Sequence, residues 1–135
     1  MTEKAQIGAS LADSGFSTYL NIVDVQKIFV KNVSGILTSA YFEKGCRELR
    51  LPEKKRIREY STGMKAKLRV LTALSHHAKL LIMDEPTAGL DVEARNHILD
   101  MLRTYMAEDE ERSILITSHI ASDLEHLCDD IYLIH

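Results

Sequence analysis

Two adjacent carboxylates follow an apolar run near the middle of the chain. In the stretch KLLIMDEPTAGLD, residues 79–91, four apolar residues lead into Asp84 and Glu85. An aspartate at the end of a strand can hold Mg²⁺, directly or through water, because hard cations prefer carboxylate oxygens. Glu85 lies one residue further, points in a different direction and could polarise a water. The pair therefore predicts a site for a metal-bound phosphate.

A second apolar run, SILITSH, ends in His119, which could donate a hydrogen bond to a phosphate oxygen. Ligands of a parallel sheet bind beyond the carboxyl ends of its strands. Asp84, Glu85 and His119 are therefore expected at one edge of the sheet. Gly89 allows the turn that presents Asp91.

Each of these residues also has a structural interpretation. An Asp-Glu pair after a strand is often a helix cap, and a lone histidine at a strand end is more often structural than catalytic. An unrelated metal-dependent hydrolase that uses Asp84, Glu85 and His119 is a further alternative. That enzyme would need more ligands than these three, and no other cluster in the sequence supplies them.

The elements that must position these residues differ between the two halves of the chain. In the first half, a short strand end, QIGASL, precedes apolar residues at helical spacing from residue 22 to about 31 and from 34 to about 49. Ser61 is a candidate N-cap for a helix that begins near Gly63. The first half is therefore expected to be almost wholly helical.

The second half alternates strands with helices, which predicts a parallel sheet. The continuous apolar run KLLIMD indicates a strand that is buried on both faces. SILITSH is expected to be a second buried strand, ASDLEHLC a short helix and IYLIH a third strand. Residues 92 to about 107 are expected to form a helix with four inward side chains, namely Ala94, Ile98, Leu102 and Tyr105.

Together these segments resemble the ATPases of ABC transporters. LLIMDEPTAGLD is almost letter for letter the Walker B and D-loop segment, YSTGMKAKL resembles the signature motif, and ITSH resembles the switch-histidine strand. SDLEHLCDDIYLI is similar to the segment that follows it. The resemblance runs from about residue 7 to the end, in the right order.

The resemblance implies an α/β fold, the RecA-like core of a P-loop NTPase, here a truncated ABC ATPase core with its helical signature subdomain. Residues 1–75 would hold the end of the glutamine-loop region and the helical signature subdomain. Residues 76–135 would form a partial RecA-like core with Walker B, the D-loop and the switch histidine.

The resemblance also implies a role for each site residue. Asp84 would bind Mg²⁺ through water, and Glu85 would be the catalytic carboxylate. His119 would be the switch that senses the γ-phosphate, and Asp91 of the D-loop would cross to a partner subunit.

The signature motif of the family is usually Leu-Ser-Gly-Gly-Gln, and this chain has Tyr60, Thr62 and Met64 at three of the five positions. Ser61 and Gly63 remain, and they would contact the γ-phosphate of ATP bound to the opposite subunit. A helix N-terminus with a hydroxyl and bare backbone amides is an anion site. The stretch from Ser61 to Met64 is therefore expected to bind nucleotide in trans.

The phosphate-binding loop of Walker A, G-x-x-x-x-G-K-[ST], does not occur in the sequence. The residues after the six glycines are Ala, Phe, Ile, Cys, Met and Leu, so there is no Gly-Lys pair. The amides and lysine of that loop cradle the phosphates. Members of the family are ATPases, yet this chain alone is expected to hydrolyse little or no ATP. The simplest interpretation of the chain is that it is the C-terminal part of a nucleotide-binding subunit.

In the intact subunit, the resemblance implies ATP and Mg²⁺ as cofactors and ATP hydrolysis coupled to transport across a membrane. The implied partners are a second nucleotide-binding subunit and a transmembrane permease subunit, which would hold the protein at the cytoplasmic face of the membrane. No apolar run approaches the ~18 residues of a spanning helix. The alternative is a non-catalytic module that contributes its signature face to a partner's ATP or docks a membrane subunit.

The resemblance places the Walker A strand between the switch-histidine strand and the final strand. Without it, SILITS would present an unpaired apolar edge, which is an association hazard. We expect either that IYLIH shifts to fill the gap or that two chains pair or swap strands there.

The composition is that of a globular domain, with 135 residues, 45% hydrophobic residues and 27% charged residues. The net charge of −3 argues against nucleic acid as a partner. Between residues 44 and 69, ten basic residues face only three acidic ones. This basic stretch could meet phosphate, an acidic partner or anionic lipid, or it could be a solvated helix face. Cys46 and Cys128 fit no metal-binding spacing, and core packing is their expected role.

Overall fold

Three parallel strands form the sheet of the computed structural model, which describes residues 7–10, 17–32 and 36–134. The strands are β1 (Ile7–Ser10), β2 (Leu80–Asp84) and β3 (Ser113–Thr117), in the order β1-β2-β3. Both pairings are parallel, and Ala9, Ile82 and Leu115 share one row of the register. The predicted parallel sheet is therefore confirmed.

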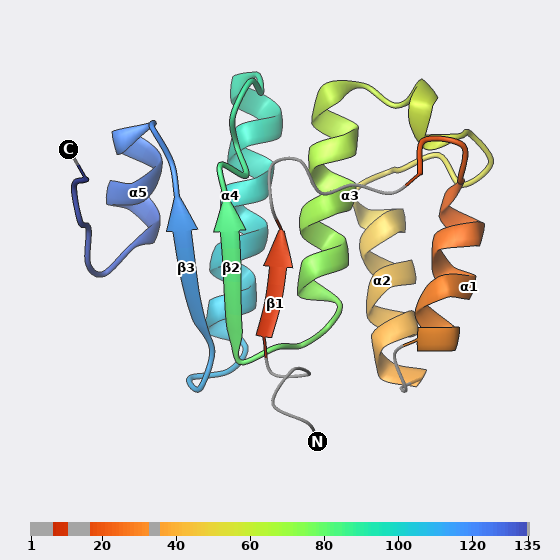
Figure 1. Ribbon diagram of the computed structural model, residues 1–135, viewed down its shortest axis with the longest axis horizontal. Coiled ribbons are helices and arrows are strands. Elements are labelled where there is room, and N and C mark those ends of the chain that lie inside the picture. The colour runs from red at the N-terminus through yellow and green to blue at the C-terminus, as the bar shows by residue number, and fades with distance from the viewer. Residues whose placement is uncertain (1–6, 11–16, 33–35, 135) are drawn as a thin grey trace.

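The described part of the chain has five α-helices: α1 (Ile22–Asn32), α2 (Ile36–Glu48), α3 (Thr62–Leu74), α4 (Val92–Ala107) and α5 (Ala121–Leu127). A short 3₁₀ helix, Ile57–Glu59, precedes α3. Figure 1 shows α4 behind the sheet, α3 next to β1, α1 and α2 beyond α3, and α5 beside β3. A helical part thus lies next to an α/β part, as the sequence predicted.

Both central helices begin with a side-chain cap, of which the one at Ser61 was predicted and the one at Asp91 was not. The Ser61 hydroxyl accepts a hydrogen bond from the Met64 amide at 3.1 Å at the start of α3. The Asp91 carboxylate accepts one from the Ala94 amide at 2.8 Å at the start of α4. Each cap satisfies an amide that the first helical turn leaves without a partner.

The apolar stripe of α4 faces inward along its whole length. Ala94, Ile98, Leu102 and Tyr105 are all buried, which confirms the four predicted inward positions. Their spacing of three and four residues places them on one side of the helix. This side packs on the sheet and on α3.

Helix α3 is shared by two apolar clusters. Leu68 and Leu71 belong to a cluster with Phe42 and other residues of the helical part, whereas Val70 and Leu74 join a cluster with residues of the sheet and α4. Cys46 is buried in the first cluster, as expected. Because α3 serves both clusters, the boundary predicted between residues 75 and 76 stays a prediction.

The sheet is buried on one face only, so the expectation of strands buried on both faces is wrong. In β2, Leu81 and Met83 are fully buried, whereas Leu80 and Ile82 are half-buried. In β3, Leu115 is 61% exposed. Parallel strands are buried on both faces where helices cover both, and α3 and α4 lie on the same face of this sheet.

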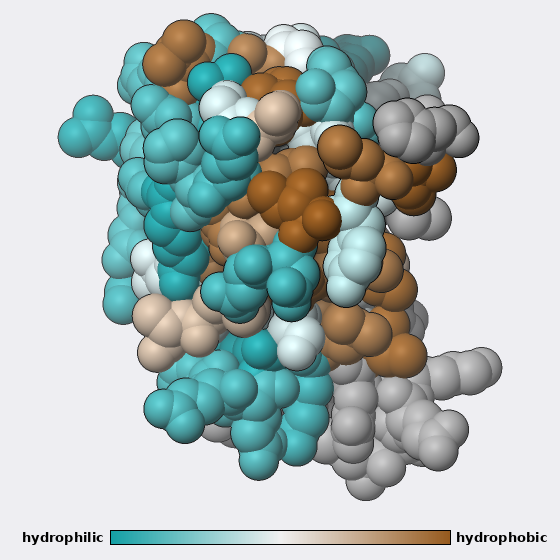
Figure 2. Space-filling view, turned by 90° about the vertical axis from the view of Figure 1, so that its left-hand side faces the viewer, coloured by the Kyte–Doolittle hydropathy of each residue, from teal (hydrophilic) through white to brown (hydrophobic). Residues whose placement is uncertain are grey.

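Residues 131–134 of the segment IYLIH do not form a strand, so both the third strand and its predicted shift into the gap are wrong. Residues 131–134 have no regular structure, and Ile134 is 95% exposed. Figure 1 shows this tail on the far side of α5 from β3, so its backbone does not reach the strand edge. Apolar side chains are visible on this side of the molecule in Figure 2. Pairing of two chains at β3, the last strand of the described sheet, stays a prediction.

A polar corner joins the amino ends of the strands to the C-terminal turn of α4. The guanidinium of Arg112 lies 3.9 Å from the centroid of the Tyr105 ring and donates to the Tyr105 carbonyl and the Glu108 carboxylate. It also lies 3.2 Å from Nδ1 of His77, whose φ is 48°. The ring of Tyr41 stands edge-on to the His77 ring at 4.8 Å.

This corner predicts a loss of stability in acid. Burial and the Arg112 guanidinium lower the pKa of His77, although Glu108 opposes them, and burial also lowers the pKa of the adjacent His76. A histidine with a lowered pKa in the folded state stabilises the fold fully above the unfolded value of about 6.5. That stabilisation is lost as the pH falls through the folded pKa.

Urea unfolding at pH values between about 7.5 and about 5 measures this effect. We expect the free energy of unfolding to fall with pH, and less steeply in His77→Asn, since asparagine tolerates a positive φ but does not titrate. His126→Asn, which removes an exposed histidine, is the matched control. An unchanged slope in His77→Asn would show that His77 is not responsible.

Candidate functional site

The first group of predicted site residues lies at the carboxyl ends of β2 and β3. The hydroxyl of Thr117, the last residue of β3, donates to Oδ1 of Asp84 at 2.5 Å. The Glu85 amide in turn donates to the Thr117 carbonyl at 3.0 Å. Glu85 has a φ of 47°, in the left-handed region, which ends the strand at Asp84. The adjacent strand therefore holds the Asp84 carboxylate and the backbone of Glu85.

His119 closes this group from the other side. Its Nδ1 lies 2.9 Å from Oε2 of Glu85, and the two side chains are 69% and 29% exposed. The predicted convergence of Asp84, Glu85 and His119 at one sheet edge is thus confirmed. A carboxylate and an imidazole in contact, open to solvent, can orient a water and a phosphate oxygen together.

The residues present suit Mg²⁺, which needs few protein ligands, better than a metal ion that is coordinated only by protein side chains. No group of three or more His, Cys, Asp or Glu side chains in the described residues could hold a metal ion. Mg²⁺ usually keeps several waters and binds through one or two carboxylates together with substrate phosphates. The oxygens of Asp84 suit that role, whereas the alternative of an unrelated metal-dependent hydrolase gains no support.

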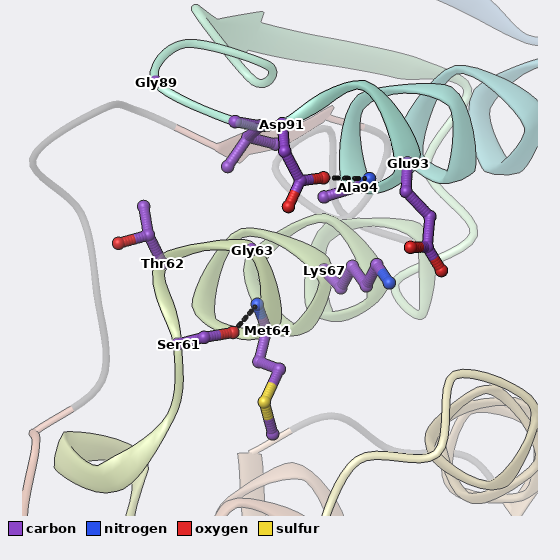
Figure 3. Close-up of a pocket in the computed structure, with 10 residues that line it drawn as sticks. Ser61, Thr62, Gly63, Met64, Lys67, Gly89, Asp91, Glu93 and Ala94 are labelled. Carbon is purple, nitrogen blue, oxygen red and sulfur yellow. Dashed lines mark hydrogen bonds between the residues drawn. The ribbon is translucent and has the colours of Figure 1, made fainter.

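The signature stretch lines a separate pocket between two helix N-termini. Ser61, Thr62, Gly63 and Met64 of the α3 start face Gly89, Leu90 and Asp91 across a pocket of about 400 Å³, which Figure 3 shows. A side chain on Gly63 would place its Cβ 3.1 Å from Cβ of Ala94, so glycine allows α3 and α4 to approach closely here. The structure therefore brings the signature residues and the D-loop together.

Two charged residues of the pocket were not predicted. Lys67, on α3, and Glu93, in the first turn of α4, also line it. Figure 3 shows their side chains pointing toward one another. The sequence signal was the spacing, because Lys67 follows Gly63 by four residues and so shares its helix face. Of the basic stretch, Lys67 is the residue that lines this pocket.

An anion in this pocket would be held from the α3 side. The amides and the hydroxyl at the start of α3 attract negative charge, as the N-termini of helices do. Asp91 and Glu93 on the α4 side oppose an anion, and Asp91 already accepts from the Ala94 amide. The residues Asp84, Glu85 and His119 line none of this pocket. The predicted site residues thus form two separate groups.

Thr117 is a further site residue that the sequence analysis did not predict. Its hydroxyl and carbonyl contact both carboxylate residues, Asp84 and Glu85. The register explains this, since Thr117 is paired with Asp84 across the sheet. The signal in the sequence was only its position two residues before His119.

One protein-family model, described as "AAA domain, putative AbiEii toxin, Type IV TA system", matches residues 53–122, more than half of the chain. The match spans the signature stretch, both carboxylates and His119. In the described residues, no helix is long and apolar enough to span a bilayer.

Several curated proteins are similar in sequence. The linearmycin resistance ATP-binding protein LnrL of Bacillus subtilis is 41% identical over 81 residues, which are 60% of this chain and 25% of that protein. The ABC transporter ATP-binding protein YtrB of the same species is 34% identical over 115 residues, 84% of this chain and 37% of that protein. The Nod factor export ATP-binding protein I of Rhizobium johnstonii is 33% identical over 140 residues, with coverages of 94% and 44%.

The chain thus spans less than half of the length of these relatives. Among solved structures, one described as the ATP binding subunit of an ABC transporter superposes with a TM-score of 0.78 at 24% identity. It covers 93% of this chain, which covers 53% of that structure. At this identity the superposition establishes the fold.

Proposed function

The chain belongs to the AAA domain family and to the ATP-binding proteins of ABC transporters, and from this membership we propose that it carries the hydrolytic and signature elements of an ATP-driven transport system. Its α/β fold is that of the P-loop NTPases. The observation that carries the proposal is the contact of His119 with Glu85 at the carboxyl edge of the sheet, 2.9 Å between Nδ1 and Oε2.

In this proposal Glu85 is the catalytic carboxylate. Glu85 accepts a proton from the water that attacks the γ-phosphate. His119 orients the Glu85 carboxylate and donates a hydrogen bond to the γ-phosphate. Mg²⁺, when bound, neutralises charge on the phosphates. Asp84 would hold that ion through water, with the Thr117 hydroxyl fixing the direction of its carboxylate.

The signature pocket is proposed to bind the γ-phosphate of ATP held by a second ATP-binding subunit. Ser61 and Gly63 would supply the hydroxyl and amide contacts, with Thr62 and Met64 beside them. Asp91 of the D-loop would reach across to that subunit. The separation of this pocket from Asp84, Glu85 and His119 supports the division, because each group would then serve a different ATP molecule.

The chain has no Gly-Lys pair and therefore no phosphate-binding loop of its own. We propose that Walker A is supplied by sequence outside these residues or by another subunit, and that this chain alone does not hydrolyse ATP. Residues 1–75 would be the glutamine-loop and signature part and residues 76–135 the catalytic part. A permease subunit would hold the assembly at the cytoplasmic face of a membrane.

A second candidate function is a non-catalytic module that only presents its signature face or docks a membrane subunit. The pocket at the start of α3 supports this candidate, because it is complete without a phosphate-binding loop. The two candidates differ in whether Glu85 matters. In the module it would be dispensable, whereas in the hydrolytic element it is essential.

Calorimetric titration of Mg-ATP into the purified chain, with Glu85→Gln alongside, tests the proposed lack of a cis site. We expect no detectable binding to either protein, because the phosphates have neither the backbone cradle nor its lysine. Binding at micromolar affinity would contradict the proposal, since this chain would then hold phosphate by other groups.

A further inference from the structure

A buried carboxylate outside the predicted site ties its loops together. Asp123, in the first turn of α5, is 2% exposed. Its Oδ2 accepts a hydrogen bond from the hydroxyl of Thr87 at 2.8 Å, and Thr87 is itself 1% exposed. Its Oδ1 lies 3.3 Å from Nε of Arg95. We call Asp123, Thr87 and Arg95 the Asp123 clamp.

A charge in this position is costly unless its partners compensate it. A buried carboxylate loses its hydration, and removal of one partner leaves the charge uncompensated. Nε of Arg95 is buried and has no aligned hydrogen bond, so its contact with Asp123 is an ion pair of imperfect geometry. The Thr87 hydroxyl is thus the well-formed hydrogen bond of the clamp. The buried charge of Asp123 is therefore compensated by the Arg95 guanidinium at imperfect geometry and by the Thr87 hydroxyl, so the position of Thr87 matters.

The three residues of the clamp come from the three segments that carry the site. Thr87 lies in the loop between Glu85 and Asp91. Arg95 lies in the first turn of α4, and its amide donates to the Asp91 carbonyl at 3.0 Å. Asp123 follows His119 by four residues. Glu85, Asp91 and His119 therefore each sit within a few residues of a clamp member.

The loop is anchored at its ends by the Glu85 amide and by Leu90, which packs against the apolar cluster of the sheet and α4, whereas its middle has weaker contacts. Its internal hydrogen bonds, from the Ala88 amide to the Glu85 carbonyl and from the Leu90 amide to the Thr87 carbonyl, are both 3.3 Å long. Ala88 and Gly89 are exposed. The contact between His119 and Glu85 is also open to solvent, since the His119 side chain is 69% exposed. Exposed pairs of this kind contribute little by themselves.

We propose that Asp123 is a positioning residue: through Thr87 and Arg95 it holds the loop of residues 85–91 against the start of α5 and so keeps His119 in contact with Glu85. The inference rests on the proposed function for the meaning of that contact. A second subunit is proposed to bind at the D-loop. Through the clamp, a displacement of the D-loop would change the position of His119.

Amide hydrogen exchange measured by NMR on the full chain, without nucleotide, tests the clamp. Thr87→Val keeps the shape of the side chain and removes the hydroxyl, and Thr87→Ser restores it. We expect Thr87→Val to accelerate exchange at Ala88 and Leu90 by about tenfold relative to the amides of β2, as the loss of a hydrogen bond to a charged group predicts. The ring resonances of His119 should shift in the same variant, and Thr87→Ser should restore both signals.

Ser75→Ala is the matched control. Ser75 is also buried, and its hydroxyl donates to the Leu71 carbonyl at 2.7 Å, away from the loop. In Ser75→Ala, the exchange rates of the loop amides and of the β2 amides should change by the same factor. The ring resonances of His119 should not shift. Asp123→Ala is a second variant with the same expected loop effect as Thr87→Val. If the loop amides of Thr87→Val followed the β2 amides, or His119 did not respond, the clamp would be overturned.

The two proposals fail separately. The exchange experiment requires no ATP, so the clamp can be confirmed or refuted whatever the nucleotide experiments show. If Glu85 proved dispensable for hydrolysis while the loop and His119 responded to Thr87→Val, the proposed function would fall and the tie between the loops would stand.

Discussion

Glu85→Gln is expected to lower the rate of ATP hydrolysis by roughly 100-fold or more in an ATP-binding protein that contains this segment. A positioned general base typically accelerates a reaction by about 10²- to 10⁴-fold. Glutamine keeps the size of the side chain but cannot accept the proton of the attacking water. The carboxylate of Glu85 contacts Nδ1 of His119 directly, and this contact could hold it in position to accept a proton from a water. Its loss should therefore affect the chemical step.

A chimera makes this measurement possible although the chain has no phosphate-binding loop. The 115 matched residues of the Bacillus subtilis protein YtrB would be replaced by the corresponding residues of this chain. The rest of that relative would supply the remainder of the subunit. Phosphate release measures hydrolysis, and Mg-ATP binding measured in parallel should be nearly unchanged, because Glu85 acts on the water and not on the nucleotide.

Glu110→Gln is the matched control for the chimera, because it makes the same chemical change at an exposed residue of the turn after α4. It should hydrolyse ATP at the rate of the unsubstituted chimera. Should Glu85→Gln also retain more than about half of that rate, the assignment of Glu85 would be wrong and the non-catalytic module would be favoured.

Leu102→Ala is expected to lower the free energy of unfolding by about 3 kcal/mol, within the range of about 2–5 for buried leucine. Leu102 is 0% exposed and lies in the cluster that joins α4 to α3 and the sheet. The substitution removes apolar contacts and leaves a cavity that close-packed neighbours can fill only in part. Against a typical total of about 5–15 kcal/mol this is a large fraction.

Urea unfolding of the wild type and the variant measures this loss. Leu115→Ala is the control, because it makes the same change on the open face of β3, where the side chain is 61% exposed. Its effect should be well below that of Leu102→Ala. Similar losses in both variants would mean that the open face is covered in solution, for instance by the chain pairing predicted at β3.

The loop of residues 85–91 connects the two groups of site residues. It begins at Glu85, beside His119, and ends at Asp91, on the wall of the signature pocket. Its middle is held by Thr87 through Asp123. A single short segment thus spans from the proposed catalytic carboxylate to the proposed subunit interface.

Local pattern predicted most of the elements and the convergence of the first group. The stripe from Ala94 to Tyr105 and the cap Ser61 predicted their own helices, because helical spacing and the first-turn amides are properties of neighbouring residues. Asp84, Glu85 and His119 could be placed at one edge because parallel strands end on the same side. The family resemblance added the roles, which stay predictions.

The tertiary structure decided what depends on segments distant in sequence. It shows one sheet face open, residues 131–134 on the far side of α5 from β3, and two contacts that no motif indicates, Thr117 to Asp84 and Thr87 to Asp123. It also places the Lys67 and Glu93 side chains in one pocket. Burial of a strand face depends on which side the helices pack, and a hydrogen bond between residues 87 and 123 depends on how two loops meet. An apolar run of suitable length indicates that a segment can be a buried strand. Only packing against the rest of the chain determines whether it is one.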